Sequence, residues 1–512
     1  MLKNIVRKNA YYDSVFLMAL TNQVKSIPGI LDCAVMMATP SNKELLEGKK
    51  LLTAESSAAG PNDLLICLNL EDRIKSDEII QSIDELFKQK ISPVSDSGAD
   101  KPVSIDSALD FLPDANIVSI SVPGTYVRYL GMKALKRGLN LFVFSDNVTI
   151  EEEIELKKFA TEHGLIVMGP DCGTAIINGK AFGFANAVNR GNVGIAAAAG
   201  TGLQELSVLI NNCRLGISQA IGLGGRDLKE KVGGLSMLWA IKMLEEDENT
   251  HLIVLVSKPP APSVEQKVLD YISKNCRKKY IINFLGGNPS ESERRGLLFA
   301  DTIERAARQA AKMSGAELPG EEETADIINL SVASFRKNEK YLRGLFSGGT
   351  LCDEAQIVLK DFVTDVYSNV AVQPEMKLKN SRVSEKNSII DLGDDEFTAG
   401  RPHPMIDNTL RKERIIQEAK DPQTAVILFD VVLGYGAHID PAGELLPAIE
   451  EARRIARAER RNIIFISHVC GTEKDPQVLS LQEKKLKDAG VVVLATNALA
   501  ARVAGAIIKG RV

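Results

Sequence analysis

The chain has 512 residues, of which 45 % are hydrophobic and 25 % are charged, and its formal net charge is −5. This balance is typical of a globular protein with about three or four domains, and it excludes a basic surface for nucleic acid. No apolar run approaches the ~18–20 residues of a membrane span, and the seven cysteines are scattered, so we expect a cytoplasmic protein without a disulfide framework.

The first 90 residues combine strand-like and helix-like patterns. They predict a helix over 12–24, strands over 34–37 and 64–68, and a helix over 77–86. We expect a small α+β domain of the ferredoxin-like type over residues 1–90. The Ser-, Pro- and Gly-containing stretch 90–101 is predicted to be a linker.

Residues 103–189 alternate strand and helix as a parallel, Rossmann-like sheet does. Buried strands are predicted over 116–122, 140–144 and 165–168. Ligands of such sheets bind at the carboxyl ends of strands, which singles out Pro123, Gly124, Thr125 and Cys172. The Gly-x-Gly-x-x-Gly fingerprint of dinucleotide sites is missing, and Cys172 has the alternative of being a small buried residue.

A small apolar strand over 193–199 turns directly into a helix through Gly200, Thr201 and Gly202. Such a turn leaves backbone N–H groups free at the positive end of the helix dipole, where a phosphate or carboxylate is favoured. The alternative is an ordinary Thr-capped helix start. This motif opens the predicted flavodoxin-like domain 190–312.

Residues 340–512 repeat the plan of 190–312 in the same order. Gly348, Gly349 and Thr350 stand where the first copy has its Gly-Thr corner, and buried strands follow over 425–429 and 463–466. A polar linker over 312–340 separates the copies. If the copies pair, both Gly-Thr corners point at one another, and one anion held between them is stabilised by both dipoles.

With these residues in view, the chain resembles the succinyl-CoA synthetase superfamily, and more closely its FdrA group of acyl-CoA-synthetase-like proteins. Gly169-Pro-Asp-Cys-Gly173 is similar to the Gly-Pro-Asn-Cys-Pro turn of the α subunit, and 35–40, 346–352 and 400–407 are similar to FdrA signatures. The resemblance implies a CoA-binding-type domain over 103–189, an α-type flavodoxin-like domain over 190–312 and a β-type one over 340–512.

Two departures from the synthetases bear on activity. Leucine stands in 294–300 where the synthetases have their phosphorylated histidine, and no ATP-grasp domain is present. The resemblance implies a subunit of oxamate carbamoyltransferase, which converts oxalurate and phosphate into oxamate and carbamoyl phosphate with two companion chains. Phosphate is then a substrate and coenzyme A a candidate cofactor. The alternatives are an acyl-CoA ligase subunit and a non-catalytic scaffold that binds CoA or an anion.

Five histidines are candidates for acid–base work near neutral pH. His403 lies between two prolines on a loop of the second copy, and His468 follows a strand there, so these two are the predicted catalytic residues. His438 also follows a strand, whereas His163 and His251 have structural positions. No pair has metal-ligand spacing, so no bound metal is expected.

Overall fold

The chain is described from a computed structural model. It covers residues 2–510 except 11, 13, 26, 40–41, 44–45, 48–50, 72–75, 92–101, 319–323, 336–337 and 399–400. The chain divides into two compact units, Met1–Pro102 and Val103–Val512, which we describe separately. Most of the linker predicted over 90–101 and the start of the 400–407 signature fall outside the described residues. Within those residues, no helix has both the length and the apolar character that crossing a bilayer requires.

The N-terminal unit is a three-stranded antiparallel sheet with helices. The sheet has the order β1 (Leu2–Arg7), β3 (Leu64–Leu70), β2 (Ile30–Met37), and α1 (Ser14–Lys25), α3 (Ala54–Ser57) and α4 (Ser76–Ile91) complete the unit. This βαββα order agrees with the expected ferredoxin-like type. Strand β1 was not predicted, because its side chains are only partly buried and do not form an apolar pattern.

A three-stranded parallel sheet opens the second unit, in the order β4 (Ile117–Ile120), β5 (Asn140–Val143), β6 (Val167–Met168). Helices α5 (Ile105–Phe111), α6 (Gly124–Leu135) and α7 (Ile150–Glu162) accompany it. The boundary expected at residue 189 does not coincide with the edge of this sheet. The hairpin of β7 (Thr174–Ile177) and β8 (Lys180–Gly183) turns at Asn178-Gly179, where φ is positive at both residues, and its strand β7 pairs with β10 of the next sheet.

The predicted duplication is visible in two sheets of one topology. The first has the order β13 (Leu298–Phe299), β12 (Lys279–Phe284), β11 (Leu252–Ser257), β9 (Arg190–Ala198), β10 (Ile217–Gly222), β7, β8. The second has the order β15 (Val366–Ser368), β16 (Asn387–Asp391), β14 (Tyr341–Phe346), β17 (Thr424–Val432), β18 (Ile464–Cys470), β19 (Val492–Leu494). Each contains the parallel order 2-1-3-4-5, which is the flavodoxin-like arrangement.

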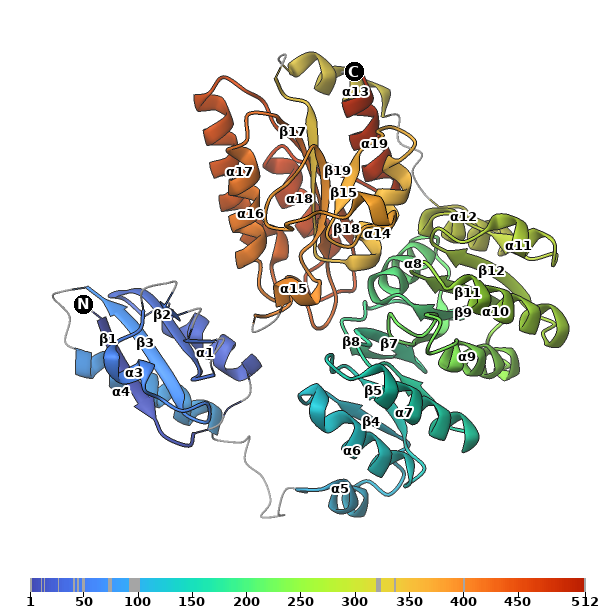
Figure 1. Cartoon of the computed structure of the whole chain (residues 1–512), viewed down its shortest axis with the longest axis horizontal. Helices are drawn as coiled ribbons and strands as arrows, with labels where there is room; N and C mark the ends of the chain where they lie inside the picture. Colours follow the sequence, from blue (N-terminus) through green and yellow to red (C-terminus); the bar gives the residue numbers. More distant parts are fainter. Residues whose placement is uncertain are drawn as a thin grey trace. The chain divides into compact units, whose positions relative to one another are not determined.

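Helices cover both faces of each large sheet. Helices α8 (Gly200–Asn212) and α12 (Ile303–Met313) lie on one face of the first sheet, and α9 (Leu235–Glu246) and α10 (Pro262–Asn275) on the other. In the second, α14 (Gly349–Leu359) and α19 (Asn497–Lys509) face α16 (Thr409–Ala419), α17 (Pro441–Ala458) and α18 (Leu479–Asp488) across the sheet (Figure 1). The shorter elements are α11 (Pro289–Glu293), η1 (Pro374–Met376) and α15 (Asp395–Thr398).

The two copies share a single hydrophobic core. Side chains of α8, α12, α14 and α19 pack together in it, so the helices of one copy face those of the other. Alanines of α12 and α19, such as Ala307 and Ala504, are fully buried and let the helices approach closely. The expected linker over 312–340 contains a helix, α13 (Ala325–Ser334), whose Ile328 and Val332 also pack against this core.

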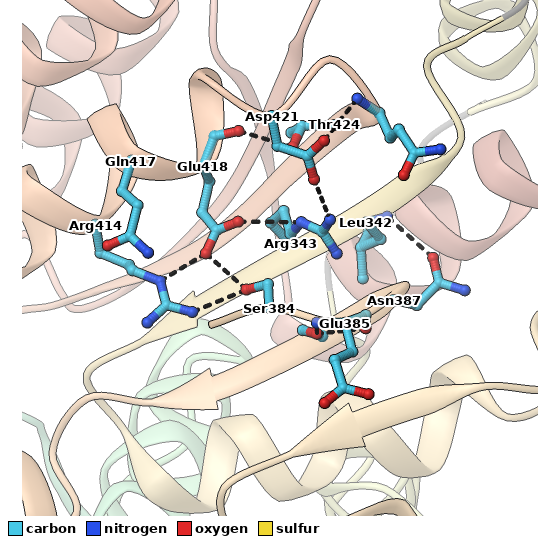
Figure 2. Close-up of polar contacts among 12 residues, drawn as sticks. Leu342, Arg343, Ser384, Glu385, Asn387, Arg414, Gln417, Glu418, Asp421 and Thr424 are labelled. Atoms are coloured by element: carbon cyan, nitrogen blue, oxygen red, sulfur yellow. Dashed lines mark hydrogen bonds and ion pairs between the residues drawn. The ribbon is translucent and has the colours of Figure 1, made fainter. Parts of the chain in front are cut away.

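A buried charge network fixes the amino-terminal end of the second sheet (Figure 2). Arg343 of β14 lies 3.1 Å from Glu418 and 2.5 Å from Asp421, and Arg414 lies 2.6 Å from Glu418. Ser384 donates to Glu418 at 2.6 Å and accepts from Arg414 at 2.8 Å. Both arginines are thus neutralised by carboxylates inside the fold.

Candidate functional site

The two Gly-Thr corners are in direct contact. The N–H of Thr350 donates to the hydroxyl of Thr201 at 3.1 Å, and neither α8 nor α14 has a side-chain cap at its start. A Cβ added to Gly202 would lie 2.9 Å from the Thr350 methyl, and one added to Gly348 would lie 2.9 Å from the Thr201 methyl. The two threonines therefore contact each other directly at the corners. The expectation of an anion held between the corners stays a prediction.

The open side of the contact is at Gly349, the first residue of α14. A Cβ added to Gly349 would lie 2.6 Å from an Asp391 carboxylate oxygen and 2.9 Å from the Lys258 ammonium. Lys258 directly follows β11, and Asp391 ends β16, so both lie at the carboxyl ends of parallel strands. Gly200, the corresponding residue of α8, is exposed and has no neighbouring atom within 4 Å of such a Cβ.

Lys258 brings a positive charge to the start of α14, beside Gly349. Its Nζ lies 3.6 Å from Asp353 of α14, and 31 % of its side chain is exposed. Asp353 raises the pKa of Lys258 against the effect of burial, and Asp391 adds to the increase. The lysine is therefore protonated at neutral pH and still reaches solvent, as a group that binds an anionic ligand must.

Two carboxyl groups near Lys258 titrate close to neutrality. Burial raises the pKa of Asp391 to about 7, although Lys258 and the N–H of Gly393 oppose the increase. Asp171, an exposed residue that follows β6, has its pKa raised to about 6 by desolvation from the surrounding protein. Groups with a pKa near the working pH are suited to proton transfer, and Asp391 is the one beside Gly349.

The loop that enters α14 is held by Asp430 of β17. Its carboxylate accepts from the N–H of Ser347 at 2.8 Å and from the N–H of Gly348 at 2.7 Å. Arg411 of α16 lies 3.1 Å from the same carboxylate. Because Asp430 and Arg411 are both buried, the start of α14 is fixed before any ligand arrives.

His403 lies beside Gly393, two residues after Asp391. A Cβ added to Gly393 would lie 2.7 Å from its Nε2. Its Nδ1 accepts from the N–H of Met405 at 3.2 Å, and burial lowers its pKa to about 4. The ring is thus neutral above pH 5, with its proton on Nε2. That N–H points to Gly393, so His403 can donate a hydrogen bond there but is a weak proton donor.

His468, the second predicted catalytic histidine, is 3 % exposed, and both its ring nitrogens are occupied. Nε2 lies 2.8 Å from Glu205 of α8, and Nδ1 lies 3.1 Å from the carbonyl of Leu494. Burial lowers the pKa of His468, but Glu205 outweighs that effect, so the pKa is raised. This position favours a structural role that joins the two copies.

Equivalent glutamates of the two copies make similar contacts in the interface around His468. Glu205 and Glu354 occupy equivalent positions, one turn after Thr201 and Thr350. Glu354 accepts from the N–H of Ile303 at 2.7 Å, at the start of α12, while Glu205 accepts from the N–H of Asn497 at 3.4 Å, at the start of α19. Each copy therefore caps the last helix of the other.

Replacing His468 by alanine should destabilise the fold without acting on the cleft. It leaves the buried Glu205 carboxylate without its cation, a change that typically costs about 3–5 kcal/mol of unfolding free energy. Urea denaturation measures this loss, and His438→Ala, which removes a partly exposed ring, is the control. Lost turnover with unchanged stability would instead give His468 a chemical role.

The residues expected to hold coenzyme A lie in two different environments in the structure. Pro123, Gly124 and Thr125 form the start of α6 without a side-chain cap, and Thr125 is exposed. This part fits a phosphate group of CoA. Cys172 does not fit: it is 2 % exposed, and burial raises its pKa to about 12, so it is a neutral core thiol.

Family models match three parts of the chain. A model described as CoA-ligase matches residues 345–507, one described as CoA binding domain matches 188–284, and one described as AllF, heavy metal-associated domain matches 1–102. The CoA-binding match thus covers β9–β12 and α8, C-terminal to the 103–189 domain expected to bind CoA. "Uncharacterized protein YahF" of Escherichia coli K12 is 44 % identical over 503 residues, which is 97 % of this chain and 96 % of that protein.

The chain belongs to the FdrA-like family of acyl-CoA-synthetase-like proteins. More distant relatives of this FdrA-like chain include the succinate–CoA ligase [ADP-forming] subunit alpha 1 of Archaeoglobus fulgidus, 24 % identical over 36 % of this chain and 62 % of that protein. The corresponding subunit alpha of Aquifex aeolicus is 26 % identical over 40 % and 68 %. The crystal structure of PH0766 from Pyrococcus horikoshii OT3 is 15 % identical and covers 81 % of this chain and 88 % of that one, with a TM-score of 0.34, which carries no functional argument.

The N-terminal unit does not fit a metal ion held by its cysteines. Cys33 packs into the core beneath α1 and α4, whereas Cys67 packs into the core on the opposite face of the sheet. Burial raises the pKa of Cys67 to about 12, so its thiol stays protonated. Among the described residues, no group of three or more His, Cys, Asp or Glu side chains is placed to hold a metal.

Proposed function

We propose that this FdrA-like chain is an enzyme subunit that binds phosphate beside Gly349 and uses it to accept a carbamoyl or acyl group. The observation that carries the proposal is the combination, in one cleft, of an uncapped helix start, the partly exposed Lys258 cation and a carboxyl group that titrates near pH 7. Fixed N–H groups and a cation favour a phosphate at this position.

We propose oxalurate phosphorolysis as the specific reaction, in the cytoplasm and with two companion subunits. A phosphate oxygen attacks the ureido carbonyl of oxalurate, and the C–O bond forms as a tetrahedral oxyanion. The C–N bond then breaks, carbamoyl phosphate is released, and the nitrogen leaves with a proton as the amide of oxamate. The hydroxyl proton of the phosphate balances the proton that the leaving nitrogen takes up.

Asp391 is the residue suited to move this proton. Its pKa of about 7 lets it donate to the leaving nitrogen and regain a proton from phosphate at neutral pH. His403, with a pKa of about 4, is neutral there and supplies an N–H for the developing oxyanion. Lys258 neutralises the attacking phosphate.

The pH dependence of turnover tests this assignment. Phosphorolysis needs protonated Asp391, so kcat should fall as the pH rises above about 7. Asp391→Asn keeps an oxygen for the N–H of Gly393 but cannot transfer a proton, so it should lose about 10²–10⁴-fold in kcat and no longer show this fall. A variant with the wild-type pH profile would remove Asp391 from the mechanism.

An assay of carbamoyl transfer tests the function itself. The chain, purified with the products of neighbouring reading frames, is given carbamoyl phosphate and oxamate, and phosphate release is measured with and without CoA. Release that requires oxamate but not CoA supports the proposal. No turnover in any combination, together with measurable CoA affinity, supports a non-catalytic scaffold instead.

The second candidate is an ADP-forming acid–CoA ligase subunit, which is favoured by the CoA-ligase match over residues 345–507. A phosphohistidine would then have to be His403, because the ring nitrogens of His468 are both occupied by protein groups. Coenzyme A would place a phosphate at the start of α6 and supply the thiol that accepts the acyl group. ATP consumption that requires both CoA and a carboxylic acid distinguishes this function from the first.

A further inference from the structure

A cavity of about 240 Å³ lies at the opposite end of the second sheet from the Lys258 cleft. It is formed by the end of α17, the first residues of β18 and the turn before β19. Arg453, Arg457 and Arg461 line it, together with Phe465 and Gly490, and none of its lining residues is acidic.

Of the arginines of this cavity, Arg453 is held by backbone carbonyls, and Arg461 forms an ion pair with a carboxylate. Arg453 donates to the carbonyls of Ala489 and Gly490, and its guanidinium lies 5.2 Å from the Phe465 ring centre. Arg461 pairs with the exposed Glu459 at 2.8 Å. Within the described part of the chain, Arg457 has no recorded ion pair. Burial lowers the pKa of Arg453 and the charge of Arg457 lowers it further, so the two cations repel each other.

The same corner of the first copy has an internal anion. Counted back from the C-caps of α10 and α17, Asp270 corresponds to Arg453, and Lys274 corresponds to Arg457. Asp270 accepts from Arg295 at 2.7 Å and lies 3.8 Å from Lys274. Arg295 precedes Gly296 as Ala489 precedes Gly490, and both glycines have positive φ. The second copy therefore keeps a cation at the Lys274 position, has Ala489 at the Arg295 position, and carries Arg453 where the first copy has its carboxylate.

Other arginines at this end of the second sheet are paired with carboxylates of the fold. Arg343 and Arg414 are neutralised by Glu418 and Asp421 (Figure 2). The missing negative charge is thus a property of the cavity and not of the whole edge.

We infer that the cavity lined by Arg453 and Arg457 is a binding site for a small carboxylate-bearing molecule, whose carboxylate supplies the negative charge that Asp270 gives to the first copy. The guanidinium group of an arginine can form two parallel hydrogen bonds with one carboxylate. Phe465, Ile463 and Val492 give the remainder of the ligand an apolar wall. The volume suits a molecule about the size of a four-carbon dicarboxylate, and the site is separate from the proposed reaction cleft.

Calorimetric titration of the full chain with succinate, and separately with inorganic phosphate, tests this site. Arg457→Ala removes an exposed side chain and should leave the fold intact, yet weaken succinate binding at least about tenfold. The double change Arg453→Asp with Ala489→Arg rebuilds the pair of the first copy and should abolish binding. Lys274→Ala, in the closed corner, and Lys258→Met, in the cleft, should leave succinate affinity unchanged.

Saturable succinate binding that both cavity variants lose confirms the site. Binding of phosphate that Arg457→Ala weakens while succinate does not bind shows an anion site of the wrong class and overturns the carboxylate assignment. No saturable binding at millimolar concentrations, or equal binding by wild type and both cavity variants, overturns the site altogether.

Discussion

Replacing Lys258 by methionine should remove most phosphate affinity and reduce turnover by about 10²–10³-fold, the usual effect of losing one electrostatic contact to a developing negative charge. The side chain keeps most of its length and stays unbranched, so packing against α14 is retained while the cation beside Gly349 is lost. Without this cation the phosphate loses its positive partner, and the pKa of Asp391, which Lys258 lowers, should rise further. Phosphate titration followed by ³¹P NMR, with steady-state kinetics, measures both effects.

Lys267→Met is the matched control for this change. Lys267 is an exposed lysine of α10 that donates to the carbonyl of Gly233 at 2.8 Å, outside the cleft. It should leave affinity and turnover unchanged. Equal phosphate affinity in Lys258→Met and wild type would remove Lys258 from the account.

Replacing Gly349 by alanine should close the site sterically. The new Cβ would lie 2.6 Å from an Asp391 oxygen and 2.9 Å from the Lys258 ammonium, so both groups must move from the helix start. We expect phosphate affinity to fall at least about tenfold. Near-native thermal stability is expected, because the atoms that must move end flexible side chains.

The duplication supplies the control for this variant. Gly200→Ala makes the same change at the equivalent corner of α8, where no atom lies within 4 Å of the added methyl. It should therefore bind phosphate as wild type does. If the two alanine variants bind phosphate equally well, the site is not at the start of α14.

Much of the fold was predictable because short stretches of the sequence indicate its strands and helix starts. The buried strands of both copies are short apolar runs, and Gly200-Thr201-Gly202 and Gly348-Gly349-Thr350 mark the helix starts that follow β9 and β14. Repetition of the same order predicted two copies of one plan whose Gly-Thr corners face each other. Strand β1 and helix α13 were missed because their side chains are mostly half-exposed and lack a clear apolar period.

The site was less predictable, because it depends on distances that no local pattern contains. Nothing in the sequence around Lys258 separates it from other lysines; its position after β11, facing the helix of another domain, gives it its role. Nor does the sequence around Asp391 indicate its raised pKa, which comes from burial by the whole fold.

For two predicted site residues, the sequence did not show that the fold encloses them. His468 was expected to follow a strand but lies inside β18, and Cys172 follows β6; both are enclosed by neighbouring elements. The threonines were expected to bind an anion, but Thr201 uses its hydroxyl to accept from Thr350. Residue type and spacing brought these groups to the correct edge of the sheet and did not determine which of them face solvent.

The most direct test of the central claim is a crystal structure of the chain soaked with tungstate, whose anomalous signal locates a phosphate-like anion. We predict a peak within hydrogen-bonding distance of both the Lys258 ammonium and the N–H of Gly349. A fully occupied peak elsewhere in the chain, with none beside Gly349, would contradict the account.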